Sequence, residues 1–126
     1  MKKQFSTSWK SSVQPRKQRK YRIKAPLHLR NKMMSVHISK ELKTKYGKRN
    51  VPVRKGDKVK VLRGQYKGRT GEVERINLKK YKVYVQGVEN IRKDGGKVQY
   101  PISPSNLMII ELKMDDKKRK ASVERK

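Results

Sequence analysis

The stretch Gly56–Val73 has the sequence GDKVKVLRGQYKGRTGEV, and it decides what kind of fold the chain can form. Its first half alternates charged and apolar residues, which places Val59 and Val61 on one face of an extended chain. Gly64 and Gly68 then bracket a short loop, where glycine accepts backbone conformations that other residues avoid. Alternation resumes after the loop. The pattern predicts two antiparallel strands joined by a tight turn.

The same alternation continues toward the C-terminus. Val83 and Val85 alternate with polar residues, and Leu107–Leu112 forms a last apolar run. Between them, Asp94-Gly95-Gly96 predicts a hairpin turn, because glycine accepts a positive φ. Short strands with regular turn signals favour a mainly β fold, and we expect about five antiparallel strands closed into a small barrel over residues 51–112.

Residues 25–50 carry helix signals instead. Pro26 can begin a helix of two turns. Ser39 is a plausible N-terminal cap for the seven residues that follow it, and Gly47 is a plausible C-terminal cap. We therefore expect one or two short helices here, packed on the barrel.

Charge is concentrated at the N-terminus. The 126 residues include 37 Lys and Arg against 10 Asp and Glu, a formal net charge of +27. The first acidic residue is Glu41, so residues 1–24 predict a basic arm that is disordered on its own. A chain this basic repels itself until a polyanion neutralises it, which indicates nucleic acid as the partner. Residues 113–126 mix both signs and predict a charged tail, either a short helix or a frayed end.

Several function classes find no support in the sequence. There is no cysteine, which excludes disulfides and zinc fingers of the Cys type. No apolar run reaches the roughly 18–20 residues that span a bilayer, so we expect no membrane insertion. The N-terminus is Ser-rich and acid-free like a mitochondrial transit peptide, but Pro15 and its polar surroundings argue against an amphipathic helix. His28 and His37 are too isolated for a metal site, and GQYKGRTG lacks the ending of a nucleotide-binding loop. We expect no enzyme, no cofactor and no small-molecule substrate.

The opening stretch resembles a KOW motif, in which an alternating strand is followed by a glycine-bracketed loop with an aromatic residue and a lysine. Other blocks stand in one order along the chain and together resemble the archaeal and eukaryotic form of ribosomal protein twenty-four of the large subunit, in the universal naming. The resemblance covers about Gln14 to Leu112. Its blocks are QPRKQRK (14–20), APLHLR (25–30), SKELKTKYGKR (39–49), VRKGD (53–57) and SPSNLMII (103–110).

This resemblance implies an SH3-like barrel with a basic N-terminal extension. It also implies a structural protein of the cytoplasmic ribosome that binds the 5′ domain of large-subunit ribosomal RNA early in assembly, near the polypeptide exit tunnel. The expected partners are that RNA and neighbouring ribosomal proteins, with targeting factors or chaperones at the tunnel exit as further candidates. The expected RNA contacts are Arg16, Lys17, Arg19, Lys20, Arg22, Lys24, His28, Arg30, Lys32, Arg63, Tyr66, Lys67, Arg69, Ser105 and Asn106.

The residue types suit this role. Arg and Lys bind phosphate oxygens, Asn can hydrogen-bond base edges, and a flat ring such as Tyr66 beside cations suits an unpaired base. Two other classes compete with a ribosomal protein. KOW domains also occur in transcription elongation factors, which usually carry an α/β domain where this chain has a basic arm. A binder acting by charge alone would not need the glycine-bracketed loop.

Overall fold

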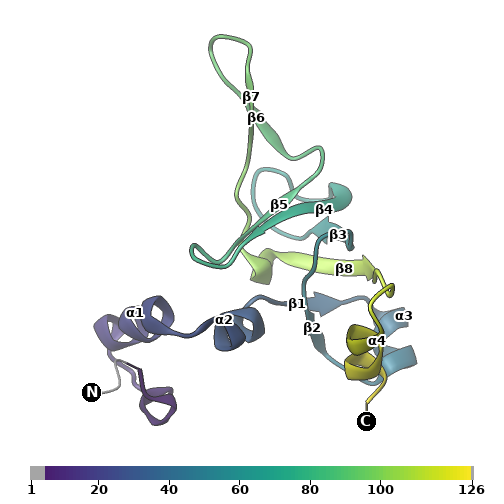
Figure 1. Cartoon of the computed structure of the whole chain (residues 1–126). Helices are drawn as coiled ribbons and strands as arrows, with labels where there is room; N and C mark the ends of the chain where they lie inside the picture. The colour runs from purple at the N-terminus through teal and green to yellow at the C-terminus, as the bar shows by residue number, and fades with distance from the viewer. Residues whose placement is uncertain (1–4, 126) are drawn as a thin grey trace.

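The computed structural model describes residues 5–125, apart from the side chain of Trp9 (Figure 1). The strands are β1 (Ser35–Ile38), β2 (Asn50–Pro52), β3 (Lys58–Val61), β4 (Thr70–Asn77), β5 (Lys82–Val85), β6 (Glu89–Ile91), β7 (Lys97–Gln99) and β8 (Leu107–Glu111). The helices are α1 (Pro15–Lys24), α2 (Leu27–Met33), α3 (Lys40–Tyr46) and α4 (Lys117–Glu124), with single 3-10 turns η1 (Thr7–Trp9) and η2 (Pro104–Asn106).

Six strands form one sheet in the order β2-β1-β8-β3-β4-β5, while β6 and β7 pair as a separate hairpin. The β1–β8 pair is parallel and the other pairs are antiparallel. The expected combination of short strands and short helices is found, but residues 5–125 form a mixed, open sheet accompanied by four helices, and the predicted closed barrel of about five antiparallel strands is wrong. Among the described residues, β2 and β5 lie at opposite ends of the sheet. The free side of β5 pairs with the segment before η2 only through the isolated bridge between Val83 and Ile102.

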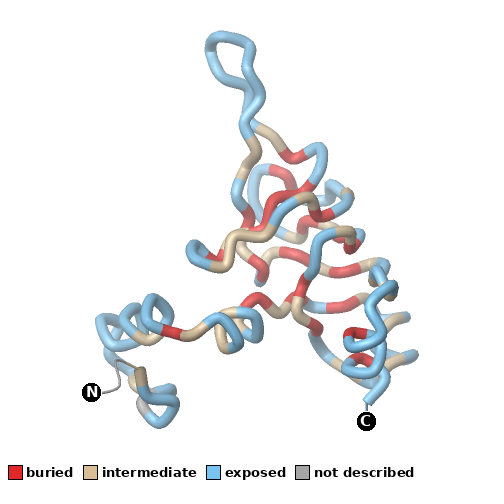
Figure 2. Tube along the Cα trace, viewed as in Figure 1, coloured by how far each residue is buried: buried red, intermediate tan, exposed pale blue. Residues whose placement is uncertain are grey.

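The sheet is larger than predicted because residues 25–50 contribute strands as well as helices. Val36 and Ile38 of β1 are buried, and the Ser39 N–H donates to the carbonyl of Ile109 over 2.9 Å. This pairing adds β1 and β2 beside β8, so the sheet extends in that direction. The core runs through its middle strands (Figure 2), and its fully buried members include Met34, Val36, Val59, Val73, Val83, Val85, Leu107 and Ile109.

Helix α3 forms as its caps predict. The Ser39 side chain accepts a hydrogen bond from the Leu42 N–H over 3.4 Å. At the other end Gly47 has φ +66, and its N–H donates to the Lys43 carbonyl over 2.8 Å. A side chain at Gly47 would strain this left-handed conformation, so the glycine ends the helix.

Helix α1 occupies the segment expected as a disordered arm. Pro15 begins the helix, a position where its missing N–H costs nothing. No residue of α1 is buried, and the helix makes contacts with the chain just before it: the Gln18 side-chain amide donates to the Ser12 carbonyl over 3.0 Å, and the Tyr21 ring centre lies 4.9 Å from that of Phe5. Its C-terminal end does touch the sheet, because the Tyr81 hydroxyl donates to the Arg22 carbonyl over 2.5 Å. Ordering of the remaining arm only on RNA stays a prediction.

Helix α4 makes the C-terminal tail part of the folded body. Arg119 and Val123 are buried, and the Arg119 guanidinium meets the buried Asp57 carboxylate through two bonds of 2.5 and 2.6 Å. Asp116 caps the helix by accepting from the Lys118 N–H. Its hydrogen bond from the Arg54 guanidinium, together with that N–H, lowers the pKa of Asp116. The ends of α3 and α4 lie side by side (Figure 1) and line a shared surface depression.

The β6–β7 hairpin stands away from the sheet (Figure 1) and is exposed along most of its length (Figure 2). Its turn forms as predicted, with Gly95 at φ +88 and the Arg92 N–H donating to the Gly96 carbonyl over 2.7 Å. Ile91 on this hairpin is 76% exposed, so the hairpin adds nothing to the core there.

Candidate nucleic-acid interface

The first surface of the interface is α1, a ten-residue helix with six cations and no acid. A helix of this length is about 15 Å long, so its charges are dense. All six cationic side chains are exposed, and they spread around more than half of the helix circumference, leaving the side that carries Gln18 and Tyr21: Arg16, Lys17, Arg19, Lys20, Arg22 and Lys24. Such a helix suits phosphate oxygens approaching from several directions.

Arg22 differs from the rest of the helix because it anchors α1. Its guanidinium carbon lies 4.4 Å from the centre of the Tyr81 ring, and its carbonyl accepts the hydroxyl of the same tyrosine. Tyr81 is buried and has φ +54, an uncommon value for a residue with a side chain. The β4–β5 turn therefore presents this ring to the arm and fixes where the charged helix begins to leave the sheet.

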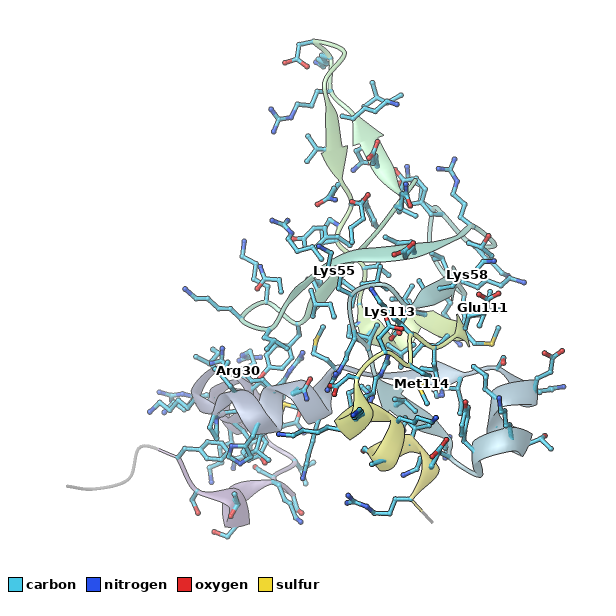
Figure 3. The ribbon with its side chains drawn as sticks, turned by 45° about the vertical axis from the view of Figure 1, so that its right-hand side comes forward. Arg30, Lys55, Lys58, Glu111, Lys113 and Met114 are labelled. Carbon is cyan, nitrogen blue, oxygen red and sulfur yellow. The ribbon has the colours of Figure 1, made fainter. Side chains whose placement is uncertain are left out.

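Arg30 of α2 also has a structural task. Its Nε donates to the Ala25 carbonyl over 2.8 Å, and its Nη2 donates to the Ile23 carbonyl. These bonds fix the link between α1 and α2, so at least part of the guanidinium is engaged with the chain itself (Figure 3). His28 and Lys32 on the same helix are exposed.

The second surface is the loop between β3 and β4. Gly64 and Gly68 have φ values of +96 and +88, which confirms that the loop needs glycine at both points. The loop is closed by the Gly68 N–H donating to the Val61 carbonyl and the Val61 N–H donating to the Arg69 carbonyl, both over 2.8 Å. Arg63, Lys67 and Arg69, the predicted cations of the loop, are exposed on this rigid frame.

The Tyr66 ring, which we expected to be available to an unpaired base, is largely buried. It is only 8% exposed, and its ring centre lies 5.0 Å from that of Tyr100. Its hydroxyl donates toward the Glu89 carbonyl over 2.8 Å. The ring thus offers little free face for a stacked base and instead holds the loop against the root of the hairpin. Arg69 lies 5.0 Å from this ring and donates to the Gly87 carbonyl over 3.0 Å.

The third surface is η2, the turn before β8. Ser105 is exposed and Asn106 is half-buried, while the Pro104 between Ser103 and Ser105 is buried and fixes the turn. The Leu62 N–H donates to the Asn106 carbonyl over 2.7 Å, so the turn lies directly beside the β3–β4 loop. The structure therefore brings the second and third surfaces together. The arm contacts the body elsewhere, at the β4–β5 turn.

Sequence reasoning missed a further cationic surface near the root of the hairpin. Arg75 lies with its guanidinium carbon 4.2 Å from the centre of the Tyr84 ring. Arg92 and Lys97 line the same depression with Gln99. No local pattern marks these residues, because they meet only through the pairing of β4 with β5 and the folding back of the hairpin.

Other kinds of site find no geometry to support them. Across residues 5–125, no group of three or more His, Asp or Glu side chains is placed to hold a metal ion. In the same part of the chain, no helix is long and apolar enough to cross a membrane. Asp57, the buried acid, is bonded to the Arg119 guanidinium.

The model of one protein family matches residues 12–126, nearly the whole chain and all three surfaces. That family comprises the ribosomal proteins L26 of eukaryotes and the L24-type ribosomal proteins of archaea. The chain belongs to this family. It is thus a structural protein of the large ribosomal subunit, a component of a ribonucleoprotein, and its family is of a non-enzymatic kind. Ribosome association and a role in translation follow from the same membership.

Proposed function

We propose that this ribosomal protein binds large-subunit RNA through surfaces with different tasks. The exposed, acid-free helix α1 supplies phosphate contacts that are blind to base sequence. The β3–β4 loop and η2 supply fixed polar groups that meet particular nucleotides. The single observation that carries this proposal is α1: six exposed cations on ten residues, held to the body at one end by Tyr81.

We infer that the target is the 5′ domain of the large-subunit RNA and that the protein joins the particle early in assembly, near the polypeptide exit tunnel. The ordered blocks shared with the family support this target. The small core supports early binding, because a domain with little buried surface gains stability from its partner. The β6–β7 hairpin stands apart from α1, which leaves it for neighbouring ribosomal proteins or for targeting factors and chaperones at the exit of a cytoplasmic ribosome.

The proposal predicts a steep dependence of RNA affinity on salt. If about eight phosphates are neutralised, the logarithm of the association constant should fall against the logarithm of salt concentration with a slope of about −6 to −7. Filter binding of the full chain to a transcript of the 5′ domain, over a series of salt concentrations, measures this slope.

A transcript of equal length from the small-subunit RNA is the matched control. We expect it to bind with a similar slope but a lower affinity, because it offers the phosphates without the cognate nucleotides. A slope shallower than about −3 for the 5′ domain would contradict an arm that lies along the RNA backbone. Equal affinity for the two transcripts would contradict the assigned target.

A further inference from the structure

A small pocket lies between the β3–β4 loop and the segment that leads into η2. Its volume is about 150 Å³. One wall comes from residues 63–66 and the other from residues 100–103 with Asn106, and Lys82 of β5 completes it. The two walls are pinned together by the bond from the Leu62 N–H to the Asn106 carbonyl and by the paired backbones of Val83 and Ile102.

The pocket combines an apolar base with a polar rim. Val61 and Ile102 are buried beneath it, and the packed rings of Tyr66 and Tyr100 lie along it. The depth is set by these side chains and by main-chain bonds, so the shape exists before any ligand arrives. Preformed concave sites with an apolar floor and a few polar groups are typical of ligand recognition.

Two side-chain amides stand on the rim, those of Gln65 and Asn106. In the part of the chain that the structure describes, neither amide has a hydrogen-bond partner, so each keeps its donors and its acceptor for a ligand. Arg63 and Lys82 add positive charge on opposite walls. No acidic residue lines the pocket.

We propose that this pocket receives one unpaired base of RNA, with the Gln65 and Asn106 amides bonding its edge and Arg63 and Lys82 meeting the phosphates on either side. The inference rests on the proposed function and names the feature of the RNA that the body recognises. An unstacked base is flat, has an apolar face and carries donors and acceptors on its edge. A paired and stacked base hides its faces and its Watson–Crick edge from so narrow a site. The net charge of +27 favours an anionic ligand.

The test compares three RNA hairpins with the full-length protein: a fully paired stem, the same stem with one bulged nucleotide, and that bulge without its base. Amide resonances of Gln65, Asn106 and their neighbours should shift with the base-bearing bulge and much less with the other two RNAs. The bulged RNA should bind roughly tenfold more tightly than the abasic one, because an abasic bulge offers no edge to the two amides and no apolar face to the pocket. Inorganic phosphate alone should not compete with the base.

The double variant Gln65→Ala with Asn106→Ala removes the amides while keeping the Asn106 carbonyl that pins the loop. It should lose the preference for the base-bearing bulge and bind the paired stem as the unaltered protein does. The matched control is Lys93→Ala on the hairpin, which should change neither the preference for the base-bearing bulge nor the affinity for the paired stem. If the double variant keeps the preference, or weakens the paired stem equally, the pocket does not receive a base. The salt slope on the 5′ domain would then still stand, so that failure is separate from a failure of RNA binding.

Discussion

Asp57 is the acid that holds the C-terminal helix α4 against the sheet, through Arg119. Besides the two bonds from Arg119, its carboxylate accepts the Arg54 N–H over 2.9 Å and the Lys113 N–H over 3.0 Å. Asp57→Asn would keep the shape of the side chain but leave the Arg119 charge buried without a counterion. Breaking one side of a buried ion pair costs about 3–5 kcal/mol. We expect a loss of that size in the free energy of unfolding, measured by urea titration.

Glu111→Gln is the control for that change, because Glu111 forms an exposed ion pair with Lys58 over 3.5 Å (Figure 3). Exposed pairs contribute about 0–1 kcal/mol, so this variant should unfold at nearly the same urea concentration as the unaltered protein. If Asp57→Asn unfolds at the same urea concentration as Glu111→Gln, the junction at Asp57 contributes little to stability.

A substitution at Gly68 tests whether the β3–β4 loop needs a glycine there. A Cβ at Gly68 would meet no atom within 4 Å, so Gly68→Val would act through its φ of +88 rather than through a clash. A strained backbone of this kind costs about 1–3 kcal/mol. Urea titration should show that loss for Gly68→Val and none for Lys67→Ala, while Lys67→Ala weakens RNA binding in the filter assay. Equal stability of the two variants would show that the loop tolerates a side chain at Gly68.

At the scale of elements, α1 meets the β4–β5 turn through Arg22, whose guanidinium and carbonyl both contact Tyr81. Isolated helices shorter than about 12–15 residues are marginal, and six like charges weaken this one further. We expect amides of residues 16–21 in the free protein to exchange rapidly with solvent and to gain protection when RNA neutralises the helix. Hydrogen exchange followed by NMR measures both states.

Tyr81→Phe sharpens that measurement, because it removes the hydroxyl that donates to Arg22 but keeps the ring. Protection near Arg22 should fall in the free variant, while protection of β3 and β8 stays as it was. Strong protection of residues 16–21 without RNA would mean that α1 is a stable part of the free protein.

Elements with strong local signals could be predicted from the sequence. The caps Ser39 and Gly47 define α3, and the glycines define both the β3–β4 loop and the hairpin turn, because each requires only its own backbone conformation. The four residues of β1 are too few for a clear period and lie between helices. Its assignment needs the pairing with β8, which is more than sixty residues away in the chain.

In the candidate site, too, some residues could be predicted from the sequence and others could not. The cations of α1 follow from charge alone, and the structure leaves them exposed. The burial of Tyr66 and the use of Arg30 within the chain depend on contacts with Glu89 and with Ile23 and Ala25, which composition does not reveal. Neither does the sequence show that the β3–β4 loop and η2 share one pocket.

For the whole molecule, we propose that the arm supplies charge and the β3–β4 loop supplies selectivity. The arm lies at one side of the sheet and the β3–β4 loop belongs to its rigid frame, so the two can be altered independently (Figure 1). A chain lacking residues 1–24 should keep its sheet, since α1 has no buried residue. It should lose about six phosphate contacts, which makes the salt slope shallower by about 4–5.

The most direct test of this separation is a competition assay between the 5′ domain transcript and a scrambled transcript of equal composition, with the chain lacking residues 1–24. We expect the affinity for both RNAs to fall by similar factors, so that the ratio between the two affinities stays within about twofold of the ratio for the full chain. If the truncation removes binding to the 5′ domain but leaves binding to the scrambled RNA, then the arm reads the RNA sequence and the proposed division between arm and loop is wrong.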